Sequence, residues 1–186
     1  MKTVHWGIIG TAQIAANVFI PALRTVSGAE LTAVASRDAS RAEAFKSNYA
    51  AIQAFSSYSG LLDNASIDAV YIPLPNSHHD HWTLEAAERG IPVFCEKPLT
   101  DASESAERLA KHCRELNIPL MEAFVFRYHP QTRVVRTLIK EGRIGTVSQI
   151  TGHMSFFFDR TQLSSNIRMD SSLGGGGLLD VVCYPV

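Results

Sequence analysis

Short apolar stretches alternate with segments of helical periodicity along the first 123 residues, and this order limits the possible folds more than any other feature. The expected strands are residues 4–9, 31–35, 69–72, 92–95 and 120–123, and the expected helices are residues 13–26, 39–49, 79–89 and 101–116. Short strands that are apolar on both faces are typical of a parallel sheet covered by helices on both sides. Because crossovers between parallel strands are right-handed, we predict an α/β fold with a doubly wound parallel sheet.

A glycine-containing turn follows the first expected strand and reads Gly10-Thr11-Ala12-Gln13-Ile14-Ala15. Dinucleotide-binding folds carry the pattern G-x-G-x-x-G/A here, because the turn must be tight and its backbone must approach a pyrophosphate. Gly10 and Ala15 match this pattern, whereas Ala12 replaces the second glycine. The first N–H groups of the next helix are suited to bind a phosphate. We therefore predict a Rossmann domain that binds a nicotinamide dinucleotide through Gly10, Thr11, Ala12, Gln13 and Ile14.

The end of the second expected strand bears on which nicotinamide cofactor binds. An acidic residue there binds the adenosine ribose, whereas a basic residue accommodates a 2′-phosphate. The sequence here is Ser36-Arg37-Asp38. Ser36 can donate its hydroxyl and Arg37 can pair with a phosphate, which favours NADP(H) over NAD(H). Asp38 leaves two alternatives open, because it can contact ribose hydroxyls or cap the next helix.

The residues after Ala123 have a different pattern. Residues 130–140 are expected to form a further helix, residues 147–158 are expected to form a long strand, and a run of glycines over residues 174–177 leads into another helix. A single helix and a single strand cannot bury the face of a sheet. We predict a nucleotide-binding domain over residues 1–123 and the incomplete beginning of a second, α+β domain over residues 124–186.

The composition excludes several classes of partner. Apolar residues make up 46% and charged residues 19% of the chain, and the net charge is −1, so neither nucleic acid nor an anionic membrane is an expected partner. The sequence has no apolar run of a membrane span's length. We also expect no signal peptide, because the first residues run into a strand-and-glycine pattern and no small-residue cleavage site follows an apolar stretch. Cys95, Cys113 and Cys183 lack metal-like or redox-like spacing. We expect reduced thiols and a cytoplasmic protein.

Several motifs together resemble the Gfo/Idh/MocA family of oxidoreductases, and within it the NADP-dependent branch of dihydrodiol and D-xylose dehydrogenases. These motifs are Pro75-Asn76-Ser77-His78-His79, Glu96-Lys97-Pro98, Glu122-Ala123-Phe124, Arg127-Tyr128-His129-Pro130, Asn166-Ile167-Arg168 and the stretch from Gly174 to Asp180. The resemblance runs along the whole chain, which covers about the first half of a family member. It implies a second domain that forms the substrate pocket and a dimer contact, so we expect a homodimer.

The resemblance implies a role for each motif residue. Lys97 is the active-site lysine, Glu96 contacts the cofactor or steadies Lys97, and the Lys97–Pro98 peptide is cis. Tyr184 is the general acid/base towards a substrate hydroxyl, and Asp180 holds the substrate or tunes Lys97. The family carries a glycine where this chain has Val182. Without the resemblance, Asp180 would be interpreted as a helix cap and Tyr184 as a tyrosine of the core.

Further residues complete the expected site. Pro73 and Asn76 are expected at the nicotinamide side of the cofactor, and His79 is expected to contact the cofactor region or orient the next helix. Arg168 is a candidate substrate contact, although a surface arginine is an equal alternative. We expect no metal, because His78 and His81 share a helical face with no further ligand in the pattern. Residues 156–158 are expected to pack in a sheet rather than to stack on a sugar.

These inferences favour an NADP-dependent oxidoreductase that moves a hydride between nicotinamide and a hydroxyl-bearing carbon of a sugar or cyclic diol. Two alternatives are a truncated, inactive paralogue that still binds a nucleotide and a binding module without a redox role. A chain with an incomplete second domain is expected to be poorly soluble or to depend on oligomerisation.

Overall fold

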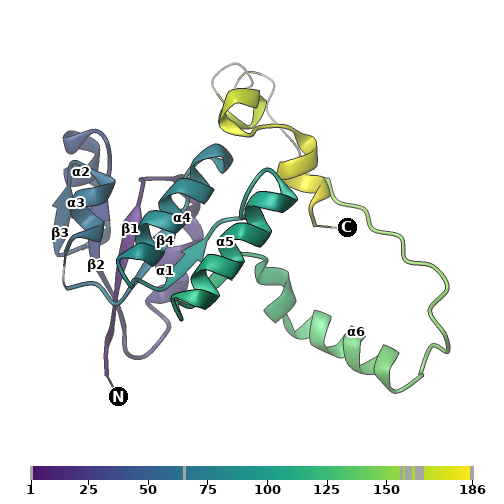
Figure 1. Ribbon diagram of the computed structural model, residues 1–186. Coiled ribbons are helices and arrows are strands. Elements are labelled where there is room, and N and C mark those ends of the chain that lie inside the picture. Colours follow the sequence, from purple (N-terminus) through teal and green to yellow (C-terminus); the bar gives the residue numbers. More distant parts are fainter. Residues whose placement is uncertain (1, 65, 156, 158–160, 162–165, 185–186) are drawn as a thin grey trace.

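The computed structural model describes residues 2–64, 66–155, 157, 161 and 166–184. Its centre is a parallel sheet of six strands in the order β3-β2-β1-β4-β5-β6 (Figure 1). The strands are β1 (Val4–Ile9), β2 (Ala29–Ala35), β3 (Gln53–Phe55), β4 (Ala69–Ile72), β5 (Val93–Cys95) and β6 (Leu120–Glu122). Successive strands are added on one side of β1 up to β3 and on its other side from β4 onward. The strand order therefore reverses between β1 and β4, which pair in parallel. The predicted doubly wound fold is confirmed.

Helices cover both faces of this sheet. The helices are a π-helical turn (Ala15–Phe19), α1 (Ile20–Leu23), α2 (Ala39–Tyr49), α3 (Tyr58–Leu62), α4 (His79–Glu88), α5 (Ser103–Glu115) and α6 (Pro130–Lys140). Short 3₁₀ turns lie at Asn76–His78, Val125–Tyr128, Ile167–Met169 and Ser171–Leu173, and a second π-helical turn lies at Leu178–Val182. In the described part of the chain, no helix has the length and apolar character needed to cross a membrane.

The core has two layers because successive strand residues point to opposite faces. Ile8 and Tyr71 face the π-helical turn, α1 and α2. Ile9 and Ile72 face α3 and α4, and α5 packs against α4 through a smaller cluster around Leu109. Burying an isoleucine contributes about 1.5–3 kcal/mol, so this alternation stabilises both layers. The cysteines are unpaired, and Cys95 and Cys113 are buried.

Some local predictions from the sequence are confirmed and others are wrong. The helix at residues 39–49 begins after Asp38, whose carboxylate caps it by accepting the N–H groups of Ser40 and Arg41. The helix expected over residues 13–26 ends at Leu23 and is π-helical over its middle, just before Pro21, which has no N–H to donate. The short β3 and α3 were not predicted, because three and five residues are too few to show a period.

The strand expected over residues 147–158 is wrong for the described residues 147–155 and 157, while residues 156 and 158 lie outside the description. These residues form an extended arm that leads away from α6 (Figure 1). Ile150 and Phe157 are 82% and 92% exposed. A strand needs a neighbouring strand for its backbone hydrogen bonds, and the described residues offer none to this segment. Residues 166–184 then return to the edge of the sheet.

Candidate active site

The carboxyl ends of β1, β4 and β5 meet where the strand order reverses, and the expected site residues lie at this edge. Doubly wound sheets bind their ligands in the crevice at this position. The turn after β1, the loop after β4 and the loop after β5 contribute Gly10, Pro73 and Glu96. The returning segment, residues 166–184, adds Arg168, Asp180 and Tyr184. The fold therefore brings together residues from both ends of the chain.

Gly10 requires a conformation that other residues rarely adopt. Its φ is +105°, and a Cβ atom there would lie 2.9 Å from Cδ2 of Leu74. Its N–H donates to the Ala35 carbonyl at 2.8 Å, which fixes the turn against β2. Ala12 does not have a positive φ, because Ala50 and Asn117 are the only such non-glycine residues in the described ranges. Alanine at the second glycine position therefore brings no backbone strain.

The first turn of the following helix is open to solvent. Gln13 and Ile14 are exposed, whereas Ala15 is buried against the sheet. The N–H groups at a helix start have no acceptor within the helix and attract anions. Thr11, Ala12, Gln13 and Ile14 thus provide a surface that can bind a pyrophosphate.

The residues after β2 divide their roles between the fold and a ligand. The Asp38 carboxylate accepts hydrogen bonds from the N–H of Ser40 at 2.9 Å, the N–H of Arg41 at 3.2 Å and the Ser40 hydroxyl at 2.7 Å. The Ser40 hydroxyl is the main cause that lowers the pKa of Asp38. Asp38 thus caps α2 through Oδ1, as one of the two alternatives expected, and its Oδ2 takes no part in these contacts. Arg37 is exposed, and the described residues give it no ion pair, so its guanidinium is available to an anion.

Lys97, Asp180 and Arg168 form a chain of ion pairs. Lys97 Nζ lies 3.0 Å from Asp180 Oδ1, and Arg168 Nε lies 2.9 Å from Asp180 Oδ2. Side chains of Lys97 and Asp180 are only 13% and 17% exposed, whereas that of Arg168 is 49% exposed. Lys97 Nζ also donates to the Asp180 carbonyl. Arg168 therefore contacts Asp180 rather than standing alone on the surface, and its exposed half still faces solvent.

Tyr184 lies beside this chain of charges. The Lys97 ammonium is 5.1 Å from the centroid of the Tyr184 ring, within the range of a cation–π contact. Phe124 and Phe126 surround the same ring, with centroid distances of 5.5 and 5.9 Å. Burial is the main cause that raises the pKa of Tyr184, and the negative charges of Glu96 and Asp180 add to it. The phenol therefore holds its proton at neutral pH and can donate it.

Two side chains tie the loops of the site together. His79 is buried, with Nδ1 2.7 Å from the Pro98 carbonyl oxygen and Nε2 2.8 Å from that of Leu74. It thus links the loop after β4 to the Lys97–Pro98 turn, whose peptide is cis as expected. The Asn76 amide donates to the Gly174 carbonyl at 2.8 Å. The structure assigns Asn76 to holding the glycine run, a contact that the sequence pattern did not predict.

Sequence reasoning missed two side chains that hold the Glu96–Leu99 loop. The Tyr71 hydroxyl donates to Glu96 Oε1 at 2.7 Å, and the Leu99 N–H donates to Glu122 Oε1 at 2.7 Å. Burial raises the pKa of Glu122. Tyr71 gave no signal because it stands within an apolar strand, whereas Glu122 belongs to a motif noted above. In the described residues, no group of three or more His, Cys, Asp and Glu side chains could hold a metal ion.

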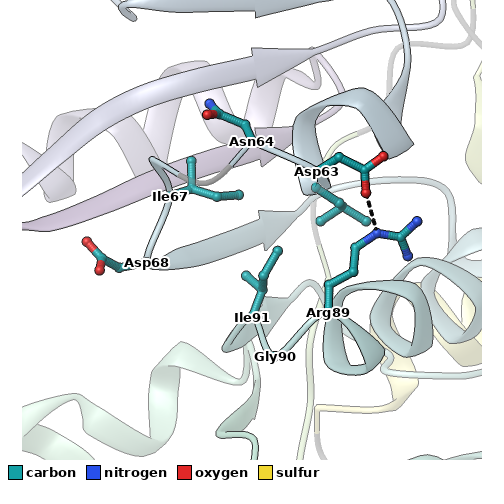
Figure 2. Close-up of a pocket in the computed structure, with 8 residues that line it drawn as sticks. Asp63, Asn64, Ile67, Asp68, Arg89, Gly90 and Ile91 are labelled. Atoms are coloured by element: carbon teal, nitrogen blue, oxygen red, sulfur yellow. Dashed lines mark hydrogen bonds and ion pairs between the residues drawn. The ribbon is translucent and has the colours of Figure 1, made fainter.

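A separate cavity of about 420 Å³ lies at the opposite edge of the sheet (Figure 2). It is lined by residues that precede β4 and β5, including Asp68 and Ile91. Arg89 Nε lies 2.8 Å from Asp63 Oδ1 at its rim. This is the amino-terminal edge of the strands, where doubly wound sheets do not hold their cofactors. Gly10, Pro73, Glu96 and Lys97 lie at the other edge, where β1, β4 and β5 end.

Comparisons with known proteins agree with this assignment. Residues 4–124 match the family described as an oxidoreductase family with an NAD-binding Rossmann fold (GFO/IDH/MocA), and residues 132–186 match the GFO/IDH/MocA C-terminal domain. A D-xylose 1-dehydrogenase (NADP(+)) from Haloferax volcanii is 41% identical over 97% of this chain and 54% of its own length. A trans-1,2-dihydrobenzene-1,2-diol dehydrogenase from Xenopus laevis is 34% identical over 97% of this chain and 54% of its own length.

A solved structure is also similar over nearly the whole chain. It is a 3-ketoreductase from Actinomadura kijaniata in complex with NADP and TDP-benzene, with 35% identity and a TM-score of 0.83 over 99% of this chain and 55% of its own. The present chain thus spans about half the length of the curated relatives it matches. The family match over residues 4–124 confirms the resemblance expected from the motifs, and the chain belongs to the Gfo/Idh/MocA family of oxidoreductases.

Proposed function

We propose that this chain carries the cofactor site and the proton-transfer residues of an NADP-dependent oxidoreductase acting on a hydroxyl-bearing carbon of a sugar or cyclic diol. The observation that carries the proposal is the meeting of Lys97, Asp180 and Tyr184 at the carboxyl edge of the sheet, beside the Gly10 turn. Family relatives named for activity on D-xylose and on a dihydrodiol support this substrate class.

The residues present fit NADP(H). Gly10 has the positive φ that the turn needs, and the exposed first turn at Gln13 and Ile14 would hold the pyrophosphate. Arg37 would bind the 2′-phosphate, because its guanidinium has no ion pair in the described residues and the neighbouring Asp38 is engaged as a cap. Pro73, Asn76 and Glu96 would lie beside the nicotinamide half, and the buried His79 would hold the loops that carry them. When bound, the cofactor supplies the hydride donor or acceptor of the reaction.

The proposed proton transfer uses Tyr184 and Lys97. In the reducing direction, the Tyr184 hydroxyl donates its proton to the oxygen that becomes the product hydroxyl, and in the oxidising direction it accepts that proton. The Lys97 ammonium, 5.1 Å from the ring centroid, stabilises the negative charge that develops on these oxygens. Asp180 holds Lys97 in place through Oδ1, and Arg168 forms an ion pair with Oδ2 of the same carboxylate.

We also propose the surroundings of the substrate. Phe124 and Phe126 lie beside the Tyr184 ring and offer an apolar wall to the face of a cyclic substrate. We further propose that residues 1–123 form the cofactor domain, that residues 124–186 begin the substrate domain, and that the active protein is a cytoplasmic homodimer.

A second candidate is a chain that binds NADP(H) without turnover. The observation that favours it is the exposure of α6, which has no buried residue, and of the arm that follows it. In this form the chain would hold the cofactor at the Gly10 turn and Arg37 and would not position a substrate.

The test combines binding and turnover. NADPH and NADH are titrated by nicotinamide fluorescence, and NADP⁺ reduction is then followed with a panel of aldoses and cyclic diols. Lys97→Ala should abolish turnover and retain NADPH affinity, whereas Lys111→Ala, an exposed lysine on α5, should change neither. Turnover in Lys97→Ala would refute the mechanism, and NADPH binding without turnover by the wild type would support the second candidate.

A further inference from the structure

Tyr71 lies in the middle of the sheet, and two aromatic side chains, Phe19 and Phe94, pack against its ring. It is 1% exposed and belongs to β4. Its ring stacks on that of Phe19 at a centroid distance of 4.0 Å and an interplanar angle of 16°, and it lies 5.3 Å from the ring of Phe94. Phe19 ends the π-helical turn that follows the glycine turn. The position of the Tyr71 hydroxyl is therefore set by the core.

The hydroxyl of Tyr71 has one acceptor, and that acceptor belongs to the candidate site. It donates to Glu96 Oε1 at 2.7 Å, while Glu96 Oε2 accepts the Lys97 N–H at 3.3 Å. Burial raises the pKa of Tyr71 far above its usual value, and the negative charge of Glu96 adds to this. The hydroxyl therefore keeps its proton at every physiological pH and acts only as a donor to Glu96.

This contact fixes the Oε1 atom of a carboxylate whose Oε2 atom accepts the longer hydrogen bond from the Lys97 N–H. A carboxylate has about four sites for hydrogen-bond donors, so two contacts leave capacity for further donors. The cofactor's nicotinamide half carries such donors, namely its ribose hydroxyls and its carboxamide. A carboxylate that is already oriented loses less conformational entropy when the ligand binds.

We propose that Tyr71 is a positioning residue for the cofactor site: its hydroxyl orients the Glu96 carboxylate so that the carboxylate receives the hydrogen-bond donors of the nicotinamide half. This inference rests on the proposed function, because it needs NADP(H) at this edge of the sheet. Tyr71 itself does not touch the cofactor and acts through Glu96.

Tyr58 provides a matched control. It is also a buried tyrosine, at 8% exposure, and packs edge-on against Trp82 with a centroid distance of 5.0 Å. In the part of the chain that the structure describes, its hydroxyl makes no side-chain hydrogen bond. Tyr58→Phe and Tyr71→Phe thus remove the same atom from a buried ring, and only the second removes a contact with Glu96.

The experiment is a double-mutant cycle on the full chain. The Kd of NADPH is measured by fluorescence for the wild type, Tyr71→Phe, Tyr58→Phe, Glu96→Ala and the double variant Tyr71→Phe/Glu96→Ala. Far-ultraviolet circular dichroism checks that each variant is folded. Tyr71→Phe should weaken NADPH binding by up to about tenfold, the upper end of the cost of ordering one side chain when a ligand binds. Tyr58→Phe should stay within about twofold of the wild type.

The cycle separates a positioning role from a structural one. In the Glu96→Ala background, Tyr71→Phe should cause no further loss, because the group through which it acts is gone. An equal loss in both backgrounds, or a Tyr71→Phe variant that binds as tightly as Tyr58→Phe, would overturn the inference while leaving the proposed function intact. A wild-type chain that does not bind NADPH would overturn both.

Discussion

Replacing Arg37 by alanine should weaken NADPH binding and leave NADH binding unchanged. Arg37 is exposed, and the described residues provide no ion pair for it, so the substitution removes no contact of the fold. The neighbouring Asp38 caps α2 through Oδ1, and the described residues show no ion pair between Asp38 and Arg37. The whole effect should therefore fall on the bound 2′-phosphate.

The size of the effect follows from the contact that is lost. A hydrogen bond to a charged group contributes about 1.5–3 kcal/mol. Since about 1.4 kcal/mol corresponds to a tenfold change in affinity, the Kd of NADPH should rise about 10- to 150-fold. NADH lacks the phosphate, so its Kd should stay within about twofold. Added salt should weaken NADPH binding more than NADH binding in the wild type.

The assay is fluorescence titration of both cofactors with the wild type, Arg37→Ala and Arg114→Ala. Arg114 is an exposed residue of α5 and provides the matched loss of one positive charge. Arg114→Ala should behave as the wild type. If Arg37→Ala raises the Kd of NADPH and NADH equally, or changes neither, then Arg37 does not bind the 2′-phosphate and the prediction is refuted.

Three further predictions concern pH and backbone geometry. Because burial raises the pKa of Tyr184 above its usual value, the rate of substrate oxidation should keep rising as the pH increases from 7 to 9, and Tyr184→Phe should lose this rise; an unchanged profile would contradict the assignment. Burial lowers the pKa of His79, so this imidazole binds a proton more readily in the unfolded chain than in the folded one. The free energy of unfolding should therefore fall as the pH drops below about 6.5, by up to about 1.4 kcal/mol per pH unit. Chemical denaturation between pH 8 and pH 5 should show this fall reduced in His79→Gln and retained in the exposed His153→Gln; equal slopes would argue against it. Gly174→Ala introduces a side chain at φ +74°, with its Cβ 2.8 Å from that of Asn76. It should lower the free energy of local unfolding of residues 174–184 by about 1–2 kcal/mol, which would appear as about tenfold faster amide exchange in this segment. Unchanged exchange would refute the close packing.

Features with a local physical cause could be predicted from the sequence. The helix at residues 39–49 was predicted with its bounds, because its cap lies two and three residues from the N–H groups that it satisfies. The Gly10 turn was predicted because only glycine adopts its backbone conformation without strain. The order of strands and helices predicted a doubly wound sheet, because handedness rules leave few ways to connect them.

Features that depend on a distant partner could not be predicted in this way. Residues 147–155 carry a strand pattern, yet a strand forms only when another strand satisfies its backbone groups. The interpretation of Arg168 as a surface or substrate residue did not include Asp180, which lies on the same returning segment. The hydrogen bond from the Asn76 amide to the Gly174 carbonyl joins residues that are 98 positions apart, so the sequence pattern did not predict it.

The sequence by itself therefore determined the class of fold, the cofactor turn and the identity of the chemical groups, since these follow from periodicity, glycine geometry and motif residues. Only the tertiary structure decided which groups meet. Lys97 and Asp180 are 83 positions apart, and Tyr71 and Glu96 are 25 positions apart on different elements. Such pairs arise because the sheet aligns the ends of its strands and the final segment packs on that edge, an outcome of the whole core rather than of any local pattern.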